Sequence, residues 1–162
     1  MLYRKTHDFL IIGAGPVGLT TALFLKKFNI DFLLLEKKSL FSTHPSAHYL
    51  NMRTMEVFSE IDGLIEKIEN RIENREFFRY YRYCRRLFDK NGVFAISDHF
   101  KPNIDEKLRE LAKFSFRSPV HLPQFSLLEV LIEKLSEMKG NQQVLLEEEV
   151  EDIRPSKEKV CE

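Results

Sequence analysis

Three glycines near the start of the chain, Gly13, Gly15 and Gly18, form the pattern G-x-G-x-x-G. In this pattern the first glycine permits a tight turn, the second lets the backbone approach a pyrophosphate, and the third lets a helix pack close to a strand. A helix beginning here offers its free N–H groups and the positive end of its dipole to phosphates. Pro16 suits the first helical turn, where its missing N–H costs nothing. These residues predict binding of a dinucleotide through its phosphates.

The residues around the glycines have the pattern of a strand–helix–strand unit. Residues 9–12 form a short apolar run that predicts a strand buried on both faces. Residues 16–28 carry apolar side chains at helical spacing and end in two lysines, where the negative end of a helix favours cations. Residues 31–35 are again apolar and predict a second strand. The sequence therefore predicts an α/β, Rossmann-like fold with a parallel sheet.

Glu36 follows the second predicted strand, at the position where a carboxylate accepts hydrogen bonds from a ribose. The same charge would repel a 2′-phosphate, which argues against NADP as the ligand of this site. The alternative interpretation is a glycine-rich junction that binds nothing. The strand, helix, second strand and terminal acid together favour a nucleotide, but they do not choose between NAD and FAD.

Composition limits the class of protein. The chain has 162 residues with 25 Lys+Arg and 25 Asp+Glu, and this zero net charge argues against a protein built mainly to bind nucleic acid or acidic lipid. The two cysteines, Cys84 and Cys161, lie far apart, so neither a disulfide framework nor a metal site is indicated. No apolar run is long enough to span a membrane, and no signal peptide precedes the fold. We expect a soluble, cytoplasmic protein.

Three segments carry a resemblance to a known family. They read GAGPVGLTTALFL from Gly13, HYLNMRTMEVF from His48 and LPQFSLLEVL from Leu122. Together they resemble the FAD-dependent aromatic-ring monooxygenases, the group that contains the phenol, para-hydroxybenzoate and polyketide hydroxylases. The resemblance extends from Asp8 to about Ile153 and implies FAD as the cofactor, with NAD(P)H as co-substrate of the intact enzyme.

The resemblance also implies roles for individual residues. Gln124 would hydrogen-bond the flavin cofactor, Glu36 would hold the adenosine ribose, and Lys37 would lie beside the adenine. The plainer alternatives are local backbone bonding for Gln124 and a solvated loop position for Lys37. Arg53 is explained equally by loop bonding and by cofactor contact. Ser46 stands where many members have an arginine that approaches the FAD phosphates, which implies weaker FAD binding or a different substrate loop.

Residues 71–86 are rich in arginine and tyrosine, and their spacing is compatible with a helix or a strand. We expect a helix ending near Arg75 and then a strand, with a hairpin turn at residues 89–92. Such a segment could bind single-stranded nucleic acid, but the zero net charge favours a sheet face with arginines lying over aromatic rings. It could also contact the rest of a larger enzyme.

The remaining elements belong to one partial FAD-binding domain over residues 1–162, which is incomplete relative to the fold of the family that the chain resembles. Helices are expected at 105–113 and 126–138, a third parallel strand at 143–146, and a solvated acidic run at 147–152. Residues 42–122 would then be inserted between the second and third parallel strands. Met52, Met55, Phe58 and Ile61 recur every three residues and predict a core stripe.

The family's later FAD motifs and its substrate-covering sheet would lie beyond residue 162, so no catalytic residue is identified here. The five histidines form no catalytic pattern and are expected in loops or on the surface; they are His7, His44, His48, His99 and His121. The favoured interpretation is the FAD-binding part of an aromatic hydroxylase acting on a small phenolic substrate, either truncated or completed by a separately encoded C-terminal half. The alternatives are a small NAD-binding or regulatory module and a non-functional remnant. Strand edges left uncovered would make the isolated chain marginally stable or prone to associate.

Overall fold

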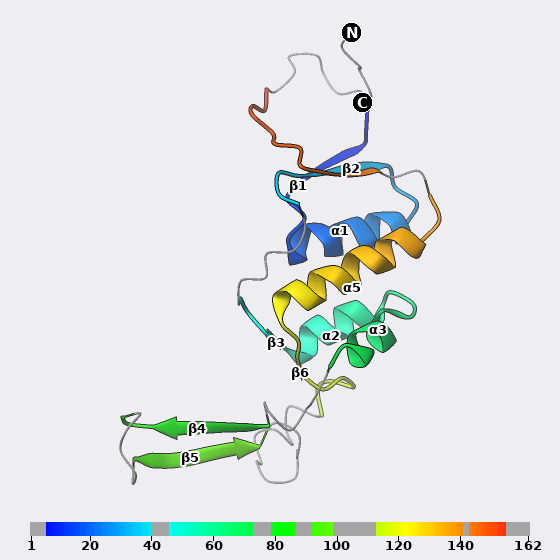
Figure 1. Ribbon diagram of the computed structural model, residues 1–162. Helices are drawn as coiled ribbons and strands as arrows, with labels where there is room; N and C mark the ends of the chain where they lie inside the picture. The colour runs from blue at the N-terminus through cyan, green and yellow to red at the C-terminus, as the bar shows by residue number, and fades with distance from the viewer. Residues whose placement is uncertain are drawn as a thin grey trace. The chain divides into compact units, whose positions relative to one another are not determined.

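The chain divides into two compact units. Unit 1 is made of Met1–Ser42 and Leu131–Glu162, and unit 2 of Thr43–Val130. The second border falls inside helix α5, Gln124–Glu137. The computed structural model, drawn in Figure 1, describes residues 6–39, 46–72, 79–86, 92–98, 113–140 and 143–154.

Unit 1 is built around a three-stranded parallel sheet. Strand β1 (Phe9–Ile12) is followed by helix α1 (Pro16–Lys27) and strand β2 (Phe32–Glu36), and strand β7 (Gln143–Leu146) comes after α5. The strand order is β1-β2-β7, with β2 in the centre and parallel to both neighbours. The predicted strand–helix–strand unit, the third parallel strand and the α/β fold class are therefore confirmed.

The core of unit 1 lies between this sheet and its helices. Phe32 and Leu34 alternate on β2, so they share one face of the sheet, and both are fully buried. Leu19 and Leu23 of α1 are equally buried. At the end of α1, the Nζ of Lys26 donates a hydrogen bond to the carbonyl of Leu135 in α5 over 3.0 Å. This bond joins the two helices where α5 has orphan carbonyl groups.

The prediction that the first strand is buried on both faces is wrong for this chain. Phe9, Leu10 and Ile12 are 51%, 52% and 51% exposed. The reason is topological: among the strands that the structure describes, β1 pairs with β2 alone and so lies at one edge of the sheet.

Unit 2 combines short helices with two small antiparallel sheets. Strand β3 (Tyr49–Leu50) pairs with β6 (Val120–His121), and β4 (Tyr80–Cys84) pairs with β5 (Val93–Asp98). Helices α2 (Met52–Ser59) and α3 (Leu64–Asn70) pack on each other. The predicted core stripe is confirmed for Met55, Phe58 and Ile61, which are nearly fully buried, while Met52 is half-buried.

Other predictions for this part of the chain are confirmed only in part. The strand after the arginine-rich stretch is confirmed as β4, but the helix ends at Asn70 rather than near Arg75. It ends there because the N–H groups of Arg71 and Ile72 bond to carbonyls only three residues back, which tightens the last turn. Most of the expected helix at 105–113 and most of the hairpin turn at 89–92 lie outside the described residues.

Two histidines differ from the prediction that all are loop or surface residues. His121 is only 6% exposed within β6, and its ring stacks on that of His48 with centroids 5.1 Å apart. The side chain of His7 is 7% exposed and its Nδ1 lies 2.7 Å from the Asp31 carboxylate. His48 itself is an exposed loop residue, and His44 and His99 lie outside the described residues.

In the part of the chain that the structure describes, no helix is long and apolar enough to cross a membrane. In the same residues, no group of histidine, cysteine and acidic side chains could hold a metal ion.

The burial difference between neighbouring strands gives a stability prediction. We expect Leu34→Ala to lower the free energy of unfolding by about 2–5 kcal/mol, because it leaves a cavity in the core. The matched change Leu10→Ala, on half-exposed β1, should cost less than about 1 kcal/mol. Urea unfolding of both variants measures the difference. Equal costs would contradict the burial described for β1.

Candidate nucleotide-binding site

The glycine-rich turn between β1 and α1 is bonded to the end of β2. Gly13 has a φ of 101°, a conformation that favours glycine, and its N–H donates to the carbonyl of Leu35 over 2.7 Å. The next N–H, that of Ala14, donates to Oε2 of Glu36, also over 2.7 Å. Two consecutive backbone groups of the turn are therefore held by two consecutive residues of the neighbouring strand.

The N-terminus of α1 has the features of an anion-binding site. Gly15 is the N-cap, no side chain in the described part of the chain caps the helix, and its first turn holds no acidic residue. The N–H groups of Val17 and Gly18 lie in that first turn, where the helix itself offers no acceptor. A Cβ placed on Gly15 would meet no atom of the described residues within 4 Å. The space over Gly15 is thus open, and the donors around it suit the diphosphate of a dinucleotide.

Gly18 serves packing, as the sequence predicts. A Cβ at this position would overlap the carbonyl oxygen of Gly13 and would lie 3.4 Å from Cγ2 of Ile11. Only a glycine lets α1 approach β1 and its turn this closely. The tight turn at Gly13 and the close approach at Gly18 therefore match the predicted roles.

Both oxygens of the Glu36 carboxylate are hydrogen-bonded to backbone groups. Oε2 accepts from Ala14, and Oε1 accepts from the N–H of Lys38 over 2.9 Å. The pKa of Glu36 is lowered from its ordinary value of 4.5, and the hydrogen bond from Ala14 is the largest cause. Burial raises the pKa, but by less than this bond lowers it. The N–H of Lys38 and the charges of Lys38 and Lys37 lower it further. Glu36 is therefore ionised at neutral pH. Each carboxylate oxygen has two lone pairs, which leaves acceptor capacity for the hydroxyls of a ribose.

Lys37 lies in an exposed ion pair. Its Nζ is 3.3 Å from Oε1 of Glu149, and both side chains are more than half exposed. The N–H of Glu148 donates to the carbonyl of Glu36 over 3.0 Å, which holds the segment after β7 beside the end of β2. The predicted position of Lys37 beside an adenine stays a prediction.

Gln124 belongs to unit 2, whereas the other six predicted site residues lie together in unit 1. Gln124 is the first residue of α5, and its backbone N–H donates to the carbonyl of Ala47 over 2.9 Å. This is a main-chain bond to a residue distant in the sequence, so it tests neither the cofactor role of Gln124 nor the local bonding that was its alternative. The role of its side chain stays a prediction.

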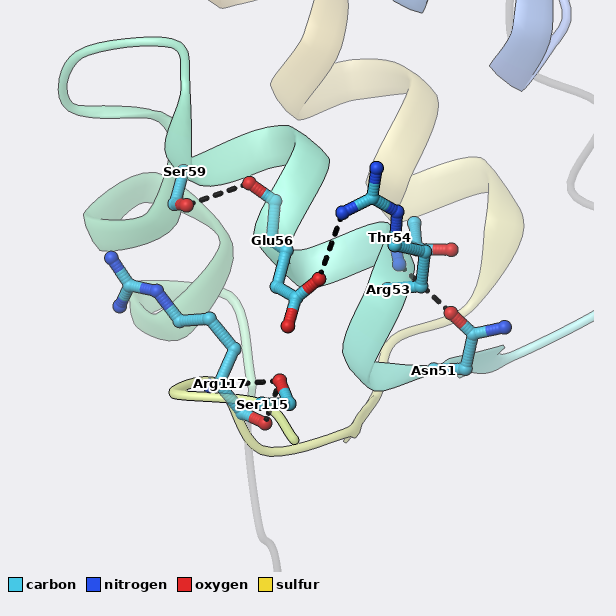
Figure 2. A network of polar contacts seen from close by, with 7 residues as sticks. All are labelled: Asn51, Arg53, Thr54, Glu56, Ser59, Ser115 and Arg117. Atoms are coloured by element: carbon cyan, nitrogen blue, oxygen red, sulfur yellow. Dashed lines mark hydrogen bonds and ion pairs between the residues drawn. The ribbon is translucent and has the colours of Figure 1, made fainter. Parts of the chain in front are cut away.

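Polar contacts around α2 explain much of the LNMRTMEVF segment structurally (Figure 2). The side-chain oxygen of Asn51 accepts from the N–H of Thr54 over 2.8 Å and so caps the helix. Arg53 is 80% exposed and donates to Glu56 over 3.0 Å. Hydrogen bonds from Ser115 and Arg53 lower the pKa of Glu56. The contact of Arg53 described here is with this carboxylate, rather than with the loop backbone.

Sequence reasoning missed the N–H groups of Ala14 and Lys38 as partners of Glu36. No residue type signals such a partner, because any residue other than proline supplies a backbone N–H. Their place beside Glu36 depends on the parallel register, in which Ile12 lies opposite Leu35.

Residues 6–161 match the family described as FAD binding domain, and the chain belongs to this family. FAD, rather than NAD, is therefore the cofactor of the fold. The chain is similar to 2,4-dichlorophenol 6-monooxygenase of Delftia acidovorans, with 31% identity over 130 residues that cover 77% of this chain and 21% of that enzyme. Phenol 2-monooxygenase of Pseudomonas sp. (strain EST1001) is 26% identical over 135 residues, covering 83% of this chain and 21% of that enzyme.

Solved structures agree with this assignment. The p-nitrophenol 4-monooxygenase PnpA from Pseudomonas putida DLL-E4 superposes with a TM-score of 0.70 at 26% identity, covering 91% of this chain and 33% of that one. The flavin-dependent monooxygenase PieE, solved with FAD and substrate, gives a TM-score of 0.70 at 25% identity, covering 88% and 24%. The predicted resemblance to FAD-dependent aromatic-ring monooxygenases is confirmed. The chain spans about a fifth of the length of the two curated relatives.

The two helix-start glycines should respond differently to an added methyl group. We expect Gly18→Ala to lower the free energy of unfolding by about 1–3 kcal/mol, because its Cβ overlaps backbone that must shift. Gly15→Ala, whose Cβ enters open space at an extended backbone conformation, should leave stability within about 0.5 kcal/mol. Urea denaturation compares the two variants. A tolerated Gly18→Ala would show that α1 does not pack this closely.

The lowered pKa of Glu36 predicts a pH-dependent contribution to stability. The pKa of Glu36 is lower in the folded chain than in the unfolded chain. The ionised carboxylate therefore contributes fully to the free energy of unfolding above pH 4.5, and this contribution is lost as the pH falls through the folded-state pKa. We expect Glu36→Gln to lower the free energy of unfolding by about 1 kcal/mol at pH 7, a small cost because solvent screens this partly exposed carboxylate. The cost should become progressively smaller at acid pH. Unfolding of wild type and variant from pH 7 to pH 3 measures this difference. A difference that is constant with pH would exclude the ionised carboxylate as its source.

Proposed function

We propose that this chain binds the ADP part of FAD as the N-terminal portion of a flavin-dependent monooxygenase that hydroxylates a small aromatic, phenolic substrate. The observation that carries the proposal is the open space over Gly15 at the uncapped start of α1, next to the ionised carboxylate of Glu36. The substrate class is supported by the relatives, two of which are named as monooxygenases of phenol and of 2,4-dichlorophenol.

Each predicted residue has a physical task in this proposal. The N–H groups of Val17 and Gly18 bind the pyrophosphate, while Gly15 leaves room for it. Glu36 accepts hydrogen bonds from the ribose hydroxyls. Lys37, paired with Glu149, lies at the adenine, and Gln124 bonds the flavin from the start of α5.

When bound, FAD supplies the redox chemistry, in which NAD(P)H provides two electrons, one oxygen atom of O₂ enters the ring and the other leaves as water. The residues of this chain hold and orient the ADP end. We assign no catalytic residue to the described part of the chain. We further propose that the parts surrounding the flavin ring and the substrate come from a C-terminal half, either of the same chain or separately encoded. The half-exposed apolar side chains of β1 support a covering partner.

Titration of the chain with FAD, ADP and NAD by equilibrium dialysis tests this proposal. We expect saturable binding of FAD and ADP, weakened at least tenfold by Gly15→Val, whose side chain would fill the space assigned to the pyrophosphate. Thr21→Val, an exposed change six residues further along the chain within α1, is the matched control and should bind as wild type. Binding of NAD without FAD would contradict the hydroxylase assignment. Folded protein that binds no nucleotide would contradict the nucleotide site itself.

A further inference from the structure

We propose that Glu36 acts as a positioning residue for the phosphate-binding turn, and that this role is separate from its contact with the ribose. The inference rests on the proposed binding of the ADP part of FAD. It assigns to one carboxylate both the recognition of the sugar and the shape of the turn that receives the pyrophosphate.

The N–H groups of the turn change from a main-chain to a side-chain acceptor where the strand pairing ends. The pairing of β1 with β2 ends at Ile12 and Leu35. The N–H of Gly13 still donates to a main-chain acceptor, the carbonyl of Leu35, but the N–H of Ala14 donates to the Glu36 side chain. The Glu36 carboxylate therefore bonds the turn to β2 one residue beyond the last main-chain bond. It does so where the backbone leaves the sheet to begin α1.

The bond from Ala14 to Glu36 also determines which N–H groups remain for the ligand. The N–H of Ala14 is directed at Glu36 and does not serve a phosphate. The donors proposed for the pyrophosphate therefore begin after it, in the first turn of α1. Because Ala14 is the residue before the N-cap Gly15, fixing its peptide group limits how that first turn can be oriented. A bond to a charged acceptor is stronger than one between neutral groups, so its loss releases the turn.

The two possible effects of the Glu36 charge change pyrophosphate binding in opposite directions. A carboxylate close to a bound diphosphate repels it, so removing the charge of Glu36 should tighten binding of inorganic pyrophosphate if electrostatics alone acts. If Glu36 positions the turn, removing the charge should weaken that binding. Glutamine retains one acceptor oxygen, whereas Glu36 uses its two oxygens for two different N–H groups. Glu36→Gln therefore cannot preserve both bonds.

Calorimetric titration with inorganic pyrophosphate and with ADP makes this test on wild type, Glu36→Gln and Glu148→Gln. Glu148→Gln is the matched control, because it removes an exposed charge at the same edge of the sheet while its backbone bond to Glu36 remains. We expect Glu36→Gln to weaken pyrophosphate binding about tenfold and ADP binding further. Glu148→Gln should leave pyrophosphate binding unchanged or slightly tighter.

A second measurement needs no ligand. Amide hydrogen exchange in the free chain should show Ala14 exchanging at least tenfold faster in Glu36→Gln than in wild type. Unchanged exchange of buried Leu34 in the central strand would show that the variant remains folded. Pyrophosphate affinity that is unchanged or raised in Glu36→Gln, with ADP alone weakened, would overturn this inference and leave the proposed function intact. A wild-type chain that binds no ADP would overturn both.

Discussion

The parallel pairing of β1 with β2 is the constraint on which the site depends. Its register places the turn after β1 directly beside the end of β2, so that residues more than twenty positions apart in the sequence meet. The glycines allow the turn to form, but the neighbouring strand determines what the turn is bonded to. The open start of α1 and the ionised carboxylate then both lie at the carboxyl ends of the parallel strands, where the phosphates and sugar of a nucleotide could be held together.

Much of unit 1 could be predicted from the sequence, because its elements are local and strongly patterned. Residues 143–146 were predicted as a strand and form β7, and the helix expected over 16–28 is α1 with Phe28 as its C-cap. The exposure of β1 could not be predicted, since an apolar run indicates a strand suited to burial but does not say what covers it. The partners of Glu36 were missed for a related reason, because backbone donors carry no residue-type signal.

Unit 2 shows a different limit. The segment from Leu50 to Phe58 helped to identify the family, yet the contacts described for it are a helix cap, an ion pair and buried apolar side chains. A sequence pattern that is typical of a family can therefore reflect the capping and packing of a helix as well as contacts with a ligand. His121 gives the converse case, because an isolated histidine had no pattern to reveal that it is buried against the ring of His48.

The half-exposed side chains of β1 also affect how the stability of the chain should be understood. Any partner that covers Phe9, Leu10 and Ile12 only in the folded state draws the folding equilibrium toward that state by mass action. The midpoint of thermal unfolding would then rise with the concentration of the partner. Stability, for such a domain, becomes a property of the assembly and its abundance as much as of the amino-acid sequence.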